Sequence, residues 1–229
     1  MHQRFSAEPS SLSLLQVILS DLARYKVTDQ RSYFSMLIIC PGTIAGIVYR
    51  VGHWIWTYNG RFSLLVTLWR PMYIIVKRLV EIITGITLQP QATIGKGLYI
   101  GHGGGIYVGG KAVLGDNCNL SHEVTIGVAG RGEKRGMPVI GNRVYIAPGA
   151  KLFGKIEIGS DVAIGANAVV TKSIPNHAVA VGIPARVISS QGSFDFVCYD
   201  GMDIDLDRLE SLRVWKQKYH GSGRAQFAG

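Results

Sequence analysis

Residues 140–170 read IGNRVY IAPGAK LFGKIE IGSDVA IGANAV V, so that an aliphatic residue returns at every sixth position. The same pattern begins near Leu88 and continues to Ile174. A period of six fits neither an α-helix, which repeats every 3.6 residues, nor a half-buried strand, which alternates every second residue. It is typical of a parallel β-helix, in which each hexad makes one short strand and one corner and three hexads close a coil.

Two positions in each hexad are predicted to point into the coil. The first is the repeated aliphatic residue, and the second is a small or branched apolar residue four places later. Cys118 occupies an inward position, so we expect it to be a buried small hydrophobe. The first set comprises Ile94, Ile100, Val108, Leu114, Leu120, Ile126, Ile140, Ile146, Leu152, Ile158, Ile164 and Val170.

The period is broken twice. The step from Ile100 to Val108 is eight residues, which adds two residues at a turn of the sequence His-Gly-Gly-Gly that begins at His102. The step from Ile126 to Ile140 is fourteen, which ejects a basic, glycine-rich loop over residues 128–138. Because insertions in a solenoid tend to fall where ligands bind, both breaks indicate a functional site.

The repeat also predicts which side chains share an edge of the coil. His102 and His122 each stand two residues after an aliphatic residue, one full coil apart. They should therefore lie in neighbouring coils, separated by about 4.8 Å, the spacing of paired strands. The same column continues through Pro148 and Ala166, and together these residues outline a groove along the coil axis.

Composition narrows the class of ligand. The chain has 229 residues, a net charge of +9 at pH 7 and 47% hydrophobic residues. A basic balance favours an acidic ligand, an anionic membrane surface or nucleic acid, and the chain has no nucleic-acid recognition motif. Its three cysteines are far apart and show no metal-ligand spacing, so we expect no metal site and a reducing, cytoplasmic location.

Residues 1–86 are predicted to form an apolar helical region. A first helix should begin at Ser10 or Ser11 and run to about Lys26, with Asp21 and Arg24 late in the helix on its wetter side.

Further apolar segments follow on either side of Pro41, and another runs over residues 62–86 with an interruption at Arg70 and Pro71. These segments fit helices that pack on each other and on partner subunits. They also fit a patch at the cytoplasmic face of the inner membrane, because Trp and Tyr at the edges and interleaved Arg and Lys are typical of interfacial helices. A membrane span is a third alternative, weakened by the break at Pro41.

Four segments of the repeat region resemble the hexapeptide-repeat acyltransferases, and in particular their serine acetyltransferase-like branch. The segments are residues 94–109, residues 124–127, residues 163–170 and residues 182–186. The resemblance implies a left-handed parallel β-helix over residues 87–189, acetyl-CoA as acyl donor, and a homotrimer or dimer of trimers with active sites between subunits. It also places the family's catalytic histidine at His102.

The resemblance assigns further roles by position. His122 would position the acceptor or work with His102 as a second catalytic residue. Substrate contacts fall on Thr87, Gly101 and Arg135. Contacts to acetyl-CoA fall on Gly127, Ala129, Arg131, Pro148, Ala166, Lys172 and Arg186.

Departures from the serine enzymes bear on the acceptor. Those enzymes carry carboxylates at the positions of Thr87 and Gly101, and an Arg-His pair where this chain has Gly136 and Met137. Colanic-acid-type exopolysaccharide O-acetyltransferases resemble this chain more closely, with a short apolar N-terminus and a histidine at His122. We therefore predict acetylation of a saccharide hydroxyl, with serine O-acetylation and a non-catalytic scaffold as the alternatives.

Residues 190–229 form an extension outside the repeat. Leu206, Leu209, Leu212 and Trp215 recur at helical spacing, which predicts an amphipathic helix over residues 203–219. We expect this helix to serve as a strut against the coils or a neighbouring subunit.

Overall fold

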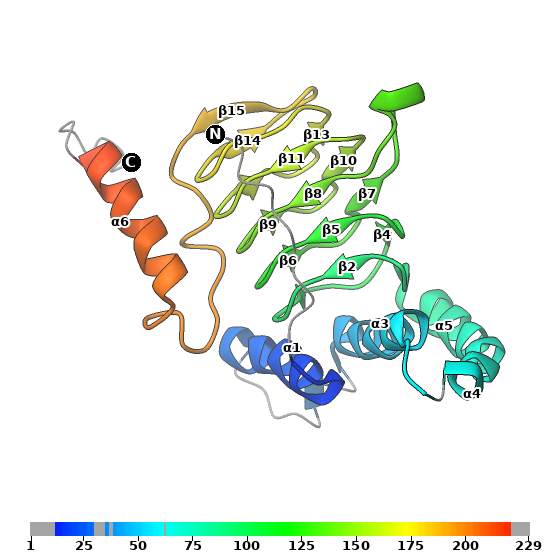
Figure 1. Cartoon of the computed structure of the whole chain (residues 1–229). Helices are drawn as coiled ribbons and strands as arrows, with labels where there is room; N and C mark the ends of the chain where they lie inside the picture. The colour runs from blue at the N-terminus through cyan, green and yellow to red at the C-terminus, as the bar shows by residue number, and fades with distance from the viewer. Residues whose placement is uncertain (1–11, 30–34, 37–38, 62, 221–229) are drawn as a thin grey trace.

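A computed structural model of the chain describes residues 12–29, 35–36, 39–61 and 63–220. Its centre is a parallel β-helix with three sheets (Figure 1). Sheet A contains β1 (Ile86–Leu88), β4 (Ile106–Val108), β7 (Thr125–Gly127), β10 (Lys151–Phe153) and β13 (Val169–Val170). Sheet B contains β2 (Thr93–Ile94), β5 (Val113–Leu114), β8 (Val139–Ile140) and β11 (Glu157–Ile158). Sheet C contains β3 (Tyr99–Ile100), β6 (Asn119–Leu120), β9 (Tyr145–Ile146), β12 (Ala163–Ile164), β14 (Val179–Val181) and β15 (Arg186–Ser189).

The strand register confirms the period of six. In sheet C, Ile100 pairs with Leu120, Leu120 with Ile146, and Ile146 with Ile164. All four side chains are buried in one continuous core that also contains Cys118, as predicted. Because inward residues of successive coils stack directly on one another, the core extends along the whole solenoid.

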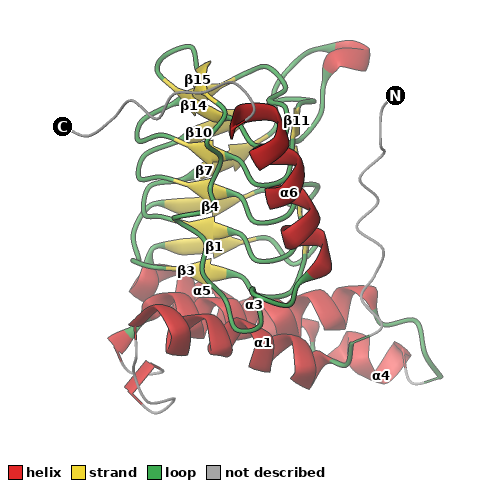
Figure 2. Ribbon diagram, turned by 90° about the vertical axis from the view of Figure 1, so that its left-hand side faces the viewer, coloured by secondary structure: helices red, strands yellow, loops and turns green. Residues whose placement is uncertain are grey.

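A layer of helices covers the first coil, as Figures 1 and 2 show. It consists of α1 (Leu14–Asp29), α3 (Pro41–Thr57), α4 (Ser63–Leu68) and α5 (Arg70–Thr84). The predicted interruption at Arg70 is confirmed, because α5 begins there and carries proline in its first turn. The predicted caps Ser10 and Ser11 lie outside the described residues. Ser13 caps α1 instead, since its Oγ accepts from the Gln16 N–H at 3.4 Å and its backbone N–H donates in return to Gln16 Oε1 at 2.8 Å.

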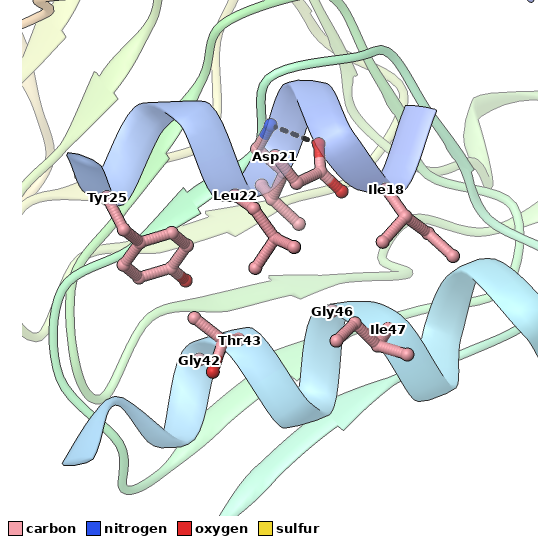
Figure 3. Close-up of a pocket in the computed structure, with 9 residues that line it drawn as sticks. Ile18, Asp21, Leu22, Tyr25, Gly42, Thr43, Gly46 and Ile47 are labelled. Carbon is pink, nitrogen blue, oxygen red and sulfur yellow. Dashed lines mark hydrogen bonds between the residues drawn. The ribbon is translucent and has the colours of Figure 1, made fainter. Parts of the chain in front are cut away.

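Helices α1 and α3 pack closely against each other and present tyrosines to the coil. Figure 3 shows Tyr25 and Leu22 of α1 facing Gly42 and Gly46 of α3. A Cβ atom on Gly42 would lie 2.4 Å from the carbonyl oxygen of Ile100, so only glycine permits this approach.

The exposed backbone edge of the first coil is satisfied by those tyrosines. The Tyr49 hydroxyl donates to the Ala92 carbonyl at 2.8 Å and accepts from the Ile94 N–H at 3.2 Å. The Tyr25 hydroxyl does the same at Ile100, with distances of 3.2 and 3.1 Å. These bonds replace the ones that a preceding coil would supply.

The expectation that Asp21 and Arg24 lie on a wet face is wrong. Both are buried, and Arg24 is only 1% exposed. Asp21 accepts two hydrogen bonds from Arg50, at 2.8 and 3.1 Å, and one from the Leu98 N–H at 2.9 Å. Arg24 donates to carbonyl oxygens of Gly97 and Cys198. The charged groups are buried because the coil corner offers them partners.

The C-terminal helix α6 (Leu206–His220) runs along one side of the solenoid (Figure 2). It contacts the coils, but only half of its predicted apolar face is covered: Leu212 and Trp215 are half-buried, and the Trp215 ring packs against Phe194 with centroids 5.9 Å apart. Leu206 is 81% exposed and Leu209 41% exposed. Polar contacts also hold the helix, since Arg143 bridges Asp161 of the coil to Asp207 of α6. A second contact joins Ser211 of α6 to Asp161 at 2.7 Å.

In the described part of the chain, no helix combines the length and the apolar character that crossing a membrane requires.

Candidate active site

The first break in the repeat forms the turn that carries His102. This turn joins β3 to β4, and Gly104 and Gly105 adopt positive φ angles of 98° and 66°. The Gly104 N–H donates to the Thr84 carbonyl at 2.9 Å, and the Gly104 carbonyl accepts from the Glu123 N–H at 2.8 Å. The turn is therefore clamped between the end of α5 and the next coil, which fixes the backbone next to His102.

The two histidines lie together as predicted. The ring centroids of His102 and His122 are 6.1 Å apart, with an interplanar angle of 67°. His102 is exposed and His122 is half-buried. Among the described residues, none donates to or accepts from the His102 imidazole. Its ring nitrogens are thus open to an acceptor hydroxyl.

The predicted column is also confirmed. Because Leu120, Ile146 and Ile164 are in register, the residues two places later stack along one edge. Pro148 and Ala166 therefore continue the line of the histidines into the following coils, and the Asn167 N–H donates to the Pro148 carbonyl at 2.9 Å. Small side chains along this edge leave space beside His102 and His122.

Backbone donors for an oxyanion are fewer than the glycine run suggests. The N–H groups of Gly104 and Ile106 are occupied by the carbonyls of Thr84 and Gly85. Neither N–H is therefore free to stabilise an oxyanion near His102. Gly101, predicted to contact the acceptor, is half-buried at the start of this turn.

The second break forms the ejected loop. Ala129 and Gly136 pair in a short antiparallel bridge, and a 3₁₀ turn, η1 (Gly132–Lys134), lies between them. Arg131 and Arg135 flank this turn and are exposed. The loop thus projects from the coil and carries exposed basic side chains.

At the foot of this loop, Gly127 ends β7 and is buried. A Cβ atom there would lie 2.7 Å from the Phe153 ring, so a larger residue would displace that ring.

The three other predicted residues lie on the outside of the coil, where they are half-buried or exposed. Thr87 is on the outer side of β1, opposite Tyr107 of β4. Lys172 and Arg186 are exposed near the far end of the solenoid, after β13 and in β15. The structure brings neither cation next to His102, so any contact with a bound donor falls at the distant end of that molecule.

Sequence reasoning missed two charged residues next to the histidine turn. The Glu123 Cγ lies 3.1 Å from the Cβ position that Gly105 would have, and the Lys151 ammonium donates to the Glu123 carbonyl. Glu123 could have been found from the sequence, because it directly follows His122. Lys151 could not, because it reaches Glu123 only through the pairing of Lys151 with Thr125 in the next coil. No group of three possible metal ligands occurs among the described residues.

Comparisons with known proteins agree with this architecture. A family model described as bacterial transferase hexapeptide, six repeats, matches residues 137–172. A serine acetyltransferase of Mycobacterium tuberculosis is 37% identical over 199 residues, which covers 84% of this chain and 82% of that protein. The chain belongs to the hexapeptide-repeat acyltransferase family.

Solved structures of this acyltransferase family give the same result. A Brucella abortus serine acetyltransferase in complex with coenzyme A has a TM-score of 0.68 at 28% identity, covering 78% of this chain and 68% of that one. A soybean serine acetyltransferase complexed with serine has a TM-score of 0.67 at 32% identity, covering 80% and 72%. The chain is thus an acyltransferase.

Proposed function

We propose that this acyltransferase transfers an acetyl group from acetyl-CoA to an acceptor hydroxyl, with His102 as general base. The observation that carries the proposal is the exposed imidazole of His102, which lies on a clamped turn. The edge of the coil that begins at this turn continues with the small side chains of Pro148 and Ala166. His102 and that edge supply a base and a surface along which the donor can lie.

The reaction needs this base, the bound acetyl-CoA, the acceptor hydroxyl and a hydrogen-bond donor for the oxyanion. The neutral imidazole of His102 takes the hydroxyl proton as the acceptor oxygen attacks the thioester carbonyl carbon. Collapse of the tetrahedral intermediate breaks the C–S bond, and the leaving thiolate takes the proton from the imidazolium. The second ring, His122, lies 6.1 Å away, where it can position the acceptor beside His102.

The donor is supported by similarity and by the shape of the edge. The B. abortus relative is described as a complex with coenzyme A. Pro148 and Ala166 provide small surfaces for the pantetheine arm, and Arg131 and Arg135 place exposed cations on the loop for its phosphates. Gly127 and Ala129 lie at the base of the same loop. Lys172 and Arg186 would meet the nucleotide end.

L-serine is the acceptor that the comparisons favour, over the saccharide predicted from sequence. The relatives above are named serine acetyltransferases, and one is complexed with serine. The exposed Glu123 carboxylate and the Lys151 ammonium offer opposite charges near His102 for the ammonium and carboxylate of an amino acid.

A saccharide hydroxyl is the second candidate. It is favoured by the absence of charged side chains at four positions where the serine enzymes carry them: Thr87, Gly101, Gly136 and Met137. A neutral acceptor would need no charged partners, and a site built to pair charges would reject it.

The test measures thiol release from acetyl-CoA with L-serine and with a panel of sugars, nucleotide sugars and lipid-linked oligosaccharides. The variant is His102→Ala, and the matched control is His53→Asn, because His53 lies in α3, where its Nδ1 contacts the Pro90 carbonyl and its ring packs against Tyr49. We expect acceptor-dependent release that His102→Ala lowers at least about a hundredfold while the control retains it.

The acceptor is decided in the same assay. If serine supports release, Glu123→Gln should raise the KM for serine about tenfold and leave the KM for acetyl-CoA unchanged. That result establishes the serine assignment. Release with a sugar alone establishes the saccharide. If no acceptor supports turnover and acetyl-CoA does not bind, the proposal is wrong and the scaffold alternative replaces it.

We further propose that the active form is a trimer, because the His102 edge is open along its length in a single chain. Light scattering of the purified protein measures this directly, and a monomer that is fully active contradicts it.

A further inference from the structure

The outer surface of the helical layer is apolar. None of the residues of α4 is buried, and Leu64 is 75% exposed. The surface continues through six side chains that we call the outer apolar face: Leu68, Trp69, Met72, Leu79, Ile82 and Ile83, each more than half exposed. A monomeric protein in water rarely exposes a contiguous apolar area of this kind, so something covers it.

The face is a property of helical spacing. Leu79, Ile82 and Ile83 follow Met72 by seven, ten and eleven residues, which places all four on one side of α5. The ionic cluster of Lys77, Arg78 and Glu81 occupies the opposite side of the same helix, where Arg78 lies 3.0 Å from Glu81. Helix α5 is thus amphipathic, with its apolar side turned outward.

A groove opens beside this face, between α3, α4 and α5. It encloses about 540 Å³ and is lined by apolar and aromatic side chains, among them Val51, Trp54, Leu65, Trp69 and Val76. Apart from the edges of its aromatic rings, the lining offers few polar partners. An elongated, purely apolar group such as a lipid acyl chain suits it better than a polar metabolite.

The charges around the face favour an anionic surface. Residues 51–84 contain four basic residues and one acidic residue, Glu81. That carboxylate is already paired with Lys77 and Arg78, whereas Arg61 and Arg70 have no ion pair among the described residues. A second copy of the chain would bring the same cations to the contact and repel it, while anionic headgroups would be attracted.

We propose that the helical layer docks on the surface of an anionic phospholipid bilayer. The outer apolar face enters the interface, Trp54 and Trp69 lie at headgroup depth, one acyl chain occupies the groove, and Arg61, Arg70 and Arg78 contact headgroup phosphates. The β-helix then stands away from the membrane, with the His102 turn next to the end of α5. This binding is independent of the acetyl transfer proposed above.

The experiment is flotation of the full chain with vesicles of phosphatidylcholine alone and of phosphatidylcholine with phosphatidylglycerol. The test variant carries Leu68→Gln, Trp69→Gln and Ile83→Gln. The matched control carries Ile204→Gln and Leu206→Gln, because those side chains are 79% and 81% exposed but belong to the C-terminal extension. All five sites are exposed, so folding should be retained, and circular dichroism checks it.

We expect binding to anionic vesicles that weakens with added salt, falls at least about tenfold in the test variant and is unchanged in the control. Brominated acyl chains should quench wild-type tryptophan fluorescence, and Trp54→Phe with Trp69→Phe should remove most of that quenching. Wild-type protein that does not float with anionic vesicles at low salt overturns the proposal. So does a larger assembly in lipid-free buffer that the test variant dissociates, since a second copy would then cover the face.

Discussion

The buried pair of Asp21 and Arg50 gives a sharp test of how the helical layer is attached. Their side chains are 11% and 5% exposed, and Arg50 also donates to the carbonyls of Ile94 and Gly95 at 2.5 and 2.6 Å. Arg50→Met would leave a buried carboxylate without its cation and two carbonyls without a donor. Breaking a buried pair costs about 3–5 kcal/mol, so we expect the free energy of unfolding to fall by about 4 kcal/mol.

The matched control is the double variant Asp21→Asn with Arg50→Met. It removes the uncompensated charge but keeps an oxygen to accept from the Leu98 N–H, so it should regain about half of the lost stability. Urea unfolding followed by circular dichroism measures all three proteins. A loss below about 1 kcal/mol in Arg50→Met, or a double variant no more stable than the single one, would refute this reasoning.

The pH dependence of Arg50→Met has a definite sign. Burial raises the pKa of Asp21, and Arg50 opposes that rise. In the variant only hydrogen bonds from the backbone N–H groups of Leu98 and Gly97 oppose it, so the folded protein holds a proton that the unfolded chain releases above about pH 4. Stability of the variant should therefore decrease as pH rises from about 4 toward 7, and its deficit relative to the wild type should shrink on acidification.

Other predictions test the donor edge, the core and the strut. Ala166→Trp should raise KM for acetyl-CoA at least about tenfold with unchanged thermal stability, because the side chain is exposed on the proposed donor path. Burial raises the pKa of the Cys118 thiol to about 11, so at pH 8 iodoacetamide should label the partly exposed Cys198 before Cys118, as mass spectrometry of peptides would show. Arg143→Met should cost about 3–5 kcal/mol in urea unfolding and Asp207→Asn under about 1 kcal/mol, since Asp207 is 69% exposed; equal losses would contradict this.

The sequence predicted whatever depends on the period of six. That period fixes which side chains point inward and which stack across coils, so the core and the column from His102 to Ala166 were both predictable. The break at Arg70 was predictable because proline is accepted only in the first turn of a helix.

The failures have a different physical origin. Asp21 and Arg24 were expected to be solvated because burying a charge is costly, and the partners that make it acceptable lie 29 to 174 residues away in sequence. Leu206 and Leu209 show helical spacing, yet α6 is held by Arg143, whose contact with Asp207 no periodicity reveals. Lys151 escaped notice because its neighbour Glu123 belongs to another coil.

The tyrosines that satisfy the first coil have a consequence for the length of the molecule. Stacked coils could in principle add further coils without limit, because each exposes the same backbone groups as the last. At one end Tyr25 and Tyr49 occupy those groups, and at the other β15 runs antiparallel to β14, which parallel stacking cannot continue. Both ends of the solenoid are therefore capped, and the number of coils is fixed. Inserting one complete coil between β6 and β9 should lengthen the protein and leave it folded, whereas deleting residues 1–57 should expose an edge that recruits other chains into fibrils.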